Sequence, residues 1–341
     1  MTTYQAFQVT GQRNFELVER KVLPPTPGHV RVRVDSCGVC HSDFLAVEGL
    51  RPDPERPVVP GHEIVGVIDA VGDGVTRWKP GDRVGVGFLG GQCGECEFCR
   101  RGDFVNCTDQ PQPGTTEDGG YAEMLYVRAT GLVRVPDQLA ANVAAPLLCA
   151  GVTTFNALRA TGAPPGALVA IQGLGGLGHL GVQYAKKLGY RVATIARGAE
   201  KSELAMALGS DHYIDSAAQD PGAALTDLGG AAAVIATAAS GASMSPLVAG
   251  LRPHGQLVVV GAAPDPIEVN TADLIFGGRS IVGSLTGSSI ENEDSLAFSA
   301  ANGIAPMIEV MPFEEAPKAY ERMMSGQARF RIVLDVAGSR Q

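Results

Sequence analysis

The sequence predicts an α/β protein with two domains: a β-rich unit, followed by a doubly wound parallel sheet of six strands. Three observations lead to this prediction. A chain of 341 residues corresponds to about two domains at roughly 100–200 residues each. Before residue 150, short apolar runs are broken by turn residues. From residue 167 onward, apolar strands alternate with helical patterns, which is typical of a parallel sheet covered on both faces.

The first 150 residues contain several strand-like segments. Val30–Val34 alternates valine with arginine, and Ile64–Val71 and Arg83–Phe88 are bounded by glycine and proline. The segment Gly90–Gly120 has little apolar periodicity but contains four cysteines. Something other than a hydrophobic core must therefore order that segment.

The second region begins with the apolar run Ala167–Ile171, which a glycine-rich loop follows. Leu177–Leu188 then places its large apolar side chains on one helical face. A second helix is predicted at about Glu200–Leu208. The other five predicted strands are Val192–Ala196, His212–Ile214, Ala232–Ala236, Leu257–Val260 and Ser280–Val282. Six such strands with helices between them predict a doubly wound sheet.

The C-terminal part, from about Ser284, returns to a mixed pattern. Ser295–Ala301 and Pro312–Ser325 have helical spacing, and Arg331–Val336 has the apolar character of a strand.

Composition argues against several classes of protein. A formal net charge of -9 disfavours a nucleic-acid binder, because such proteins neutralise phosphates with basic residues. Two stretches without charged residues, Ala160–Ala185 and Leu228–Leu251, contain proline and many small residues, so neither is expected to span a membrane. Seven cysteines are too few for a disulfide scaffold. With no signal-peptide pattern at the N-terminus, we expect a cytoplasmic protein.

A glycine pattern indicates a dinucleotide site. Gly173, Gly175, Gly176, Leu177 and Gly178 belong to a G-x-G-x-x-G run that follows a predicted strand and opens a helix. The first glycine permits a tight turn, the second lets the backbone approach a pyrophosphate, and the third lets the helix pack on the sheet. The alternative is a glycine-rich turn in an ordinary strand–helix unit.

The end of the next strand bears on cofactor choice. NAD sites usually carry an acidic residue there, about 20 residues after the glycines, but this strand ends in Ala196 and Arg197, with Lys201 close behind. Arg197 and Lys201 could bind the 2′-phosphate of NADP, which favours NADP. Alternatively, Arg197 and Lys201 are only solvated surface cations, and NAD remains the other candidate cofactor.

Four cysteines form a candidate structural metal site. Cys93, Cys96, Cys99 and Cys107 have the spacing C-x2-C-x2-C-x7-C in a loop-like segment, which is typical of structural zinc. Soft thiolates would also suit an iron–sulfur cluster, although the spacing differs from the bacterial ferredoxin pattern. Disulfides are a further alternative.

Cys40, His62 and Cys149 are candidates for a second metal site. Two thiolates and one imidazole would leave a fourth position free, as catalytic zinc requires. Spacing alone cannot show that three residues so distant in sequence meet. Cys37 is interpreted as a small buried hydrophobic residue.

Taken together, the motifs resemble those of a known family. The chain is similar, over essentially its whole length, to zinc-dependent alcohol dehydrogenases of the medium-chain dehydrogenase/reductase superfamily. The matching segments are Cys40-His41-Ser42-Asp43, Gly61-His62-Glu63, the four-cysteine lobe, Cys149-Ala-Gly-Val-Thr153 and Gly173–Gly178.

The resemblance implies a GroES-like catalytic domain over residues 1–150, with a structural-zinc lobe at about 90–110. It also implies a Rossmann dinucleotide-binding domain over residues 151–285 and a return to the catalytic domain over 286–341.

The family also implies roles for the matching residues. Cys40, His62 and Cys149 correspond to the catalytic-zinc ligands, the Cys2His set already known for alcohol dehydrogenases. Glu63 corresponds to a carboxylate that can approach the metal when ligands exchange. Asp43 corresponds to the partner that orients His62.

Three more positions match residues that handle the proton and the cofactor. Ser42 corresponds to the hydroxyl that takes the substrate proton, His41 to a residue at the cofactor pyrophosphate, and Thr153 to a residue beside the nicotinamide. The implied cofactors are two zinc ions per chain and NADP or NAD. The implied reaction is reversible oxidation of a primary or secondary alcohol, in which zinc lowers the pKa of the bound alcohol.

The chain departs from many relatives near the expected substrate site. Leu45 stands where many carry a histidine that completes a proton relay, so the proton must leave through water or the cofactor ribose. Leu50 and Phe88 stand near positions where small-alcohol enzymes often have tryptophan. These differences suggest a roomier pocket for larger or aromatic alcohols and aldehydes.

The sequence allows three alternatives to this function. The protein could be an aldehyde reductase of the cinnamyl-alcohol type that works mainly in the reductive direction with NADPH. A zinc-free quinone or enoyl reductase on the same fold would lack the cysteine set, which is complete here. A non-catalytic zinc-binding protein on the same fold is the third, and the intact Ser42, His62 and Cys149 argue against it. The family also implies a homodimer or homotetramer through the last strand of the cofactor domain.

Overall fold

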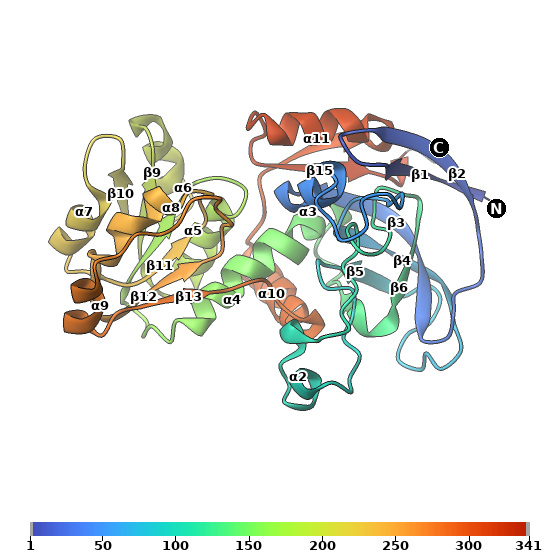
Figure 1. Ribbon diagram of the computed structural model, residues 1–341, viewed down its shortest axis with the longest axis horizontal. Helices are drawn as coiled ribbons and strands as arrows, with labels where there is room; N and C mark the ends of the chain where they lie inside the picture. Colours follow the sequence, from blue (N-terminus) through green and yellow to red (C-terminus); the bar gives the residue numbers. More distant parts are fainter. Residues whose placement is uncertain (1–2, 339–341) are drawn as a thin grey trace. The chain divides into compact units, whose positions relative to one another are not determined.

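A computed structural model describes residues 3–338 of the chain (Figure 1). These residues form two compact units. The first comprises residues 3–152 and 287–338, and the second comprises 153–286, against predicted boundaries near 150 and 285.

The second unit contains the predicted six-stranded sheet, which confirms the doubly wound fold class (Figure 1). All neighbouring strands are parallel, in the order β10-β9-β8-β11-β12-β13. The strands are β8 (Leu168–Gln172), β9 (Arg191–Ala196), β10 (His212–Asp215), β11 (Ala231–Ala236), β12 (Leu251–Val259) and β13 (Ser280–Gly283). The helices are α4 (Val152–Ala160), α5 (Gly178–Lys187), α6 (Ser202–Ala207), α7 (Pro221–Asp227), α8 (Gly241–Met244) and α9 (Thr271–Gly277).

The sequence explains the position of the central strands. Every residue of β8 and β11 is buried, which fits their continuous apolar composition, because helices cover both faces of a parallel sheet. The strand order reverses between β8 and β11. In such sheets, ligands bind beyond the carboxyl ends of the strands at this switch point, and there the glycine loop follows β8.

The first unit is built on strands that pair antiparallel, except for the parallel pair β14–β15. A seven-stranded sheet has the order β14-β15-β3-β4-β5-β7, with β6 also paired to β3, and β1 and β2 form a separate hairpin. The strands are β1 (Thr3–Val9), β2 (Phe15–Lys21), β3 (His29–Val39), β4 (Glu63–Val71), β5 (Arg83–Val86), β6 (Met124–Arg128), β7 (Leu132–Arg134), β14 (Ile308–Pro312) and β15 (Arg331–Asp335). The helices are α1 (Phe44–Val47), α2 (Glu97–Arg100), α3 (Ala141–Pro146), α10 (Ser289–Asn302) and α11 (Ala316–Met324).

The region around Cys149 is one continuous helical stretch. Helix α3 continues through a π-helical turn, Leu147–Gly151, into α4. The whole stretch Ala141–Ala160 is apolar and long enough to cross a membrane, but 72% of its most apolar window is buried within the protein, as in a core helix.

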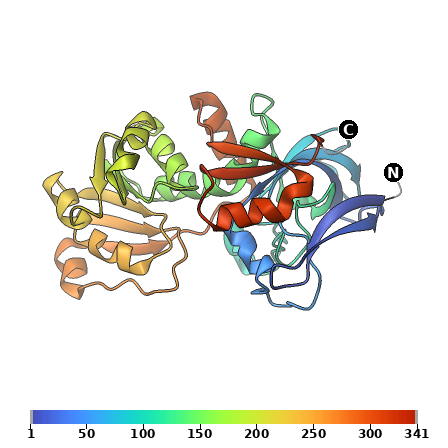
Figure 2. The same cartoon turned by 90° about the horizontal axis from the view of Figure 1, so that it is seen from above.

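The predicted helix Pro312–Ser325 is shorter than expected. Pro312 ends strand β14, and α11 begins only at Ala316. Figure 2 shows this red helix alongside the red strands β14 and β15. Proline does not disturb the strand because β14 lies at the edge of the sheet.

Candidate functional site

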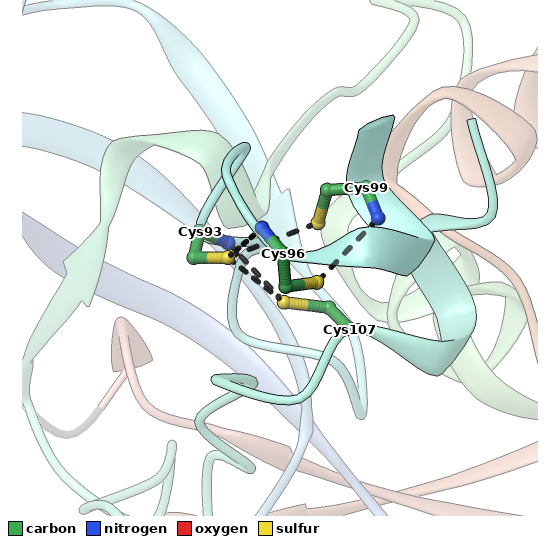
Figure 3. A group of neighbouring side chains, drawn as sticks. All are labelled: Cys93, Cys96, Cys99 and Cys107. Atoms are coloured by element: carbon green, nitrogen blue, oxygen red, sulfur yellow. Dashed lines mark hydrogen bonds between the residues drawn. The ribbon is translucent and has the colours of Figure 1, made fainter. Parts of the chain in front are cut away.

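The four lobe cysteines lie together, each with its sulfur turned toward the others (Figure 3). All four sulfur atoms lie within 4.8 Å of one another. Cys93 and Cys99 are 3.9 Å apart, sulfur to sulfur, and Cys93 and Cys107 are 3.6 Å apart. The lobe is held by the short helix α2 and by turns, since it has no core of its own.

These spacings distinguish between the alternatives. A disulfide joins sulfurs at about 2.05 Å, and all seven cysteines are free. A tetrahedral zinc ion with bonds of about 2.3 Å requires sulfurs about 3.8 Å apart. The observed distances of 3.6–3.9 Å match that value and leave room for a single ion, not for a cluster between the thiolates.

Backbone donors prepare the lobe thiolates for a metal. The amides of Glu95 and Cys96 donate to the sulfur of Cys93 at 3.4 Å. Hydrogen bonds from the amides of Cys99 and Thr108 lower the pKa of Cys96 to about 6. Because the thiolate is the form that binds metal, these donors favour metal binding near neutral pH.

The second metal-binding group consists of Cys40, His62, Glu63 and Cys149, whose ligand atoms also lie within 4.8 Å of one another. The sulfurs of Cys40 and Cys149 are 3.8 Å apart, again the edge length of a zinc tetrahedron. The thiol contact with Cys149 lowers the pKa of Cys40, and His62 contributes further.

Strand pairing brings these distant residues together. In the antiparallel β3–β4 pair, Gly38 lies opposite Glu63, so Cys40 after β3 reaches His62 before β4. Cys149 comes from the π-helical turn, a distortion often found at functional sites.

Two buried atoms at this site fit a metal ion. The Nε2 atom of His62 and the Oε2 atom of Glu63 have no hydrogen-bond partner among the described residues. Buried polar atoms normally have partners, so both point to a ligand that is to be bound. Three soft or imidazole donors with a nearby carboxylate suit zinc.

Asp43 lies directly behind His62. Its Oδ1 atom lies 2.9 Å from Nδ1 of His62, a buried contact that orients the imidazole so that Nε2 faces the metal position. Its Oδ2 atom accepts from the amide of Cys40 at 3.0 Å and from the hydroxyl of Tyr121 at 2.9 Å. No motif in the sequence points to Tyr121.

Arg331 is the second residue that the sequence analysis missed. It forms a buried ion pair with Oε1 of Glu63 at the start of β15, where β15 pairs with β3. Burial raises the pKa of Glu63 to about 8, although Arg331 opposes this shift. A charged residue at the head of an otherwise apolar buried strand is the only sequence signal that could have revealed it.

Gly38 provides the space for this carboxylate. A Cβ atom on Gly38 would lie 2.0 Å from Oε2 of Glu63, so only glycine fits beside the carboxylate.

The other residues of the first unit that the sequence singles out have the following places in the structure. His41 is exposed and Ser42 is half-buried, and both lie in the turn His41–Asp43 after β3. Phe88 packs edge-on against the ring of His62, with centroids 5.2 Å apart. Leu50 is 62% exposed. Cys37 is fully buried, as interpreted from the sequence.

The glycine loop lies in the second unit, together with Thr153, which is buried. Gly173 has φ +95°, and a Cβ on Gly178 would lie 1.8 Å from the carbonyl oxygen of Gly173. A Cβ on Gly175 would meet nothing within 4 Å, so its backbone is open to a ligand. The helix α5 begins at Gly178, so Gly176 and Leu177 lie directly before its N-terminal end, the end of a helix that favours a pyrophosphate.

Beyond the end of β9 lie both charges that the sequence predicts, and two carboxylates that it does not predict are nearby, Glu200 in the following turn and Asp215 at the end of β10. Arg197 is exposed, and Nζ of Lys201 donates to its carbonyl oxygen at 3.0 Å. Asp215 accepts from the amide of Gly198 at 2.9 Å, and a Cβ on Gly198 would touch the carboxylate of Glu200.

A GroES-like sheet with a buried Cys2His group, a four-cysteine lobe and a Rossmann unit with an open glycine loop define a zinc-dependent medium-chain dehydrogenase. Residues 26–137 match the family model described as alcohol dehydrogenase GroES-like domain, and residues 176–301 match zinc-binding dehydrogenase. The chain belongs to the zinc-binding alcohol dehydrogenase family.

Individual relatives agree. The alcohol dehydrogenase patD of Penicillium expansum is 44% identical over 318 residues, which cover 93% of each chain. Among solved structures, a cinnamyl alcohol dehydrogenase of Sorghum bicolor superposes with a TM-score of 0.89 at 35% identity over 98% of both chains. The cinnamyl alcohol dehydrogenase of Helicobacter pylori, solved in complex with NADP(H), has a TM-score of 0.85 at 28% identity over 98% of this chain and 99% of that one.

The chain is therefore an oxidoreductase that interconverts small-molecule alcohols with aldehydes or ketones, and it uses zinc and a nicotinamide cofactor.

Proposed function

We propose that this enzyme holds two zinc ions per chain, one at Cys40, His62 and Cys149 and one at the four lobe cysteines. The observation that carries the proposal is the match of sulfur spacing at both groups, 3.8 Å and 3.6–3.9 Å, to the edge of a zinc tetrahedron. Only the first group combines three ligands with an unpartnered Nε2 atom, which is the open arrangement of a catalytic site.

At the catalytic site, a bound zinc ion supplies Lewis acidity that makes an alcohol proton more acidic. Residues of the chain position the ligands, accept the proton and bind the cofactor. Asp43 fixes the tautomer of His62, and Ser42, two residues from the Cys40 ligand, receives the proton. Glu63 is held by Arg331 with one oxygen free. His41, Thr153 and the glycine loop bind the cofactor.

Two measurements test these assignments: the zinc content of the wild-type protein and the turnover of a Ser42 variant. We expect elemental analysis of purified wild-type protein to give about two zinc ions per chain. Ser42→Ala should keep both ions and bind cofactor normally, while kcat falls by about 10²–10⁴-fold, the range of general acid–base steps.

Ser325→Ala, which removes an exposed hydroxyl of the same unit, is the matched control and should turn over normally. A wild-type zinc content near one, with full activity, would remove the two-zinc assignment. Wild-type kcat in Ser42→Ala would remove the relay role alone.

We infer that the substrates are larger or aromatic alcohols and aldehydes. Phe88 forms an apolar wall directly against the ligand His62, and Leu50 carries no aromatic bulk. Two solved relatives are named as cinnamyl alcohol dehydrogenases, which supports an aromatic substrate.

For the cofactor we propose a preference for NADP(H). Arg197 is exposed at the carboxyl end of β9, Lys201 folds back onto it, and Ala196 leaves the position without a carboxylate side chain. Of the neighbouring carboxylates, that of Asp215 already accepts hydrogen bonds from the backbone amides of Gly198 and Ala217. A guanidinium can bind a 2′-phosphate with two parallel hydrogen bonds.

Arg197→Ala should raise the KM for NADP(H) by roughly 10–150-fold, because a charge-assisted hydrogen bond contributes about 1.5–3 kcal/mol. The KM for NAD(H) should change little. Arg191→Ala, at the opposite end of β9, is the matched control, since its guanidinium donates to the carbonyl of Leu228. Better kcat/KM with NAD(H) in the wild type, unaltered by Arg197→Ala, would show that the cations are only solvated.

We also propose that the enzyme assembles as a homodimer or homotetramer and acts in the cytoplasm. Strand β13 is an edge strand, and Phe276 beside it is 90% exposed, a combination that suits pairing with a second copy. Seven free cysteines suit a reducing compartment.

A further inference from the structure

We propose that Tyr121 is a positioning residue for the catalytic metal: its hydroxyl holds Asp43, and Asp43 in turn holds the ligand His62. The inference rests on the proposed zinc site and concerns a side chain two contacts away from the metal. The chain of contacts runs from the Tyr121 hydroxyl to Oδ2 of Asp43 at 2.9 Å, and from Oδ1 of Asp43 to Nδ1 of His62 at 2.9 Å.

Asp43 requires such support because it is buried. Its side chain is fully enclosed, so its carboxylate depends on the donors around it instead of on water. Oδ1 faces His62, whereas Oδ2 is held by one backbone amide, that of Cys40, and by the Tyr121 hydroxyl. Without the hydroxyl, one amide alone would set the rotation of the carboxylate that orients the imidazole.

The backbone fixes Tyr121 relative to His62 as well. Gly119, Gly120 and Tyr121 donate from their amides to the carbonyls of Val59, Gly61 and Pro60, the residues that lead directly into His62. The segment that carries the donor is therefore hydrogen-bonded to the segment that carries the metal ligand.

The space for the aromatic ring is specific. A Cβ atom on Gly61 would lie 2.5 Å from Cδ1 of Tyr121, so the ring packs directly against the backbone of Gly61, which has φ +99°. Tyr121 is completely buried. A ring that only filled this slot would serve equally well as phenylalanine, whereas the hydroxyl has a defined acceptor.

The variant Tyr121→Phe separates these two roles, because it keeps the ring and removes one oxygen. We expect zinc to leave the catalytic site of the holoenzyme about 10-fold faster under a chelator, since loss of outer contacts to metal-bound histidines typically costs 10–100-fold in metal affinity. The lobe zinc should leave at the wild-type rate. The KM for the cofactor should not change, while kcat falls with the disturbed ligand.

Tyr320→Phe is the matched control. Tyr320 is also buried in the first unit, and its hydroxyl also donates to a carboxylate, Glu48, at 3.1 Å, but neither residue belongs to the metal-binding groups. This variant should lose stability comparable to that lost by Tyr121→Phe and release zinc at the wild-type rate.

A double-mutant cycle with Asp43→Asn tests whether Tyr121 acts on the metal ligand through Asp43. If Tyr121 acts through Asp43, Tyr121→Phe should add little to the release rate in the Asp43→Asn background. Equal zinc release from Tyr121→Phe and wild type, or an undiminished effect in the Asp43→Asn background, would overturn the inference. A wild-type enzyme that is active without a chelatable zinc would instead overturn the proposed catalytic site.

Discussion

Cys149→Ser is expected to abolish alcohol turnover while the protein stays folded. The substitution removes one of two thiolates at the catalytic group and leaves a poorer ligand, so the ion should be lost or misplaced. Metal Lewis acidity contributes several kcal/mol to such reactions, which corresponds to a fall in kcat of about 10³-fold or more. Metal analysis should give about one zinc ion per chain, the lobe ion.

Cys37→Ser is the matched control for this experiment. Cys37 is a fully buried cysteine of the same unit, in β3, but it is not part of either metal-binding group. It should retain both ions and measurable turnover, although it loses some stability. If Cys149→Ser kept wild-type kcat with two bound ions, Cys149 could not be a ligand of the catalytic metal.

The second large effect is expected at the lobe. Cys96→Ser removes the thiolate whose pKa the backbone amides lower to about 6, and the lobe should lose its ion. Zinc binding to structural sites supplies about 10–16 kcal/mol in zinc-finger peptides. Loss of even a third of that binding free energy would lower the Tm by roughly 10 °C, since 1 kcal/mol corresponds to about 2–4 °C in a unit of this size.

Calorimetry with limited proteolysis measures this effect, and residues 90–110 should become the first site of cleavage. Glu97→Gln is the control, because it removes an exposed ion pair with Arg101 on the same lobe without touching a cysteine. An unchanged Tm and protease pattern in Cys96→Ser, with one ion fewer, would show that the lobe folds without its metal.

Local sequence determined much of this protein. The six parallel strands could be predicted because a strand buried on both faces must be apolar throughout, as in β8 and β11. The lobe could be predicted because its four cysteines lie within 15 residues, a spacing that leaves few ways to bind a metal other than together. The glycine loop was recognisable because the turn at Gly173 needs a positive φ and the close approach at Gly178 leaves no space for a Cβ atom.

Only the tertiary structure decided how the catalytic group is assembled. Cys40, His62 and Cys149 meet because of the β3–β4 register and a π-helical turn, and neither leaves a local periodic signal in the sequence. The same holds for the supporting residues: Tyr121 reaches Asp43 across 78 positions, and Arg331 reaches Glu63 across 268. A buried polar side chain is defined by its partner, and that partner is chosen by strand pairing and packing over distances along the chain that sequence patterns do not record.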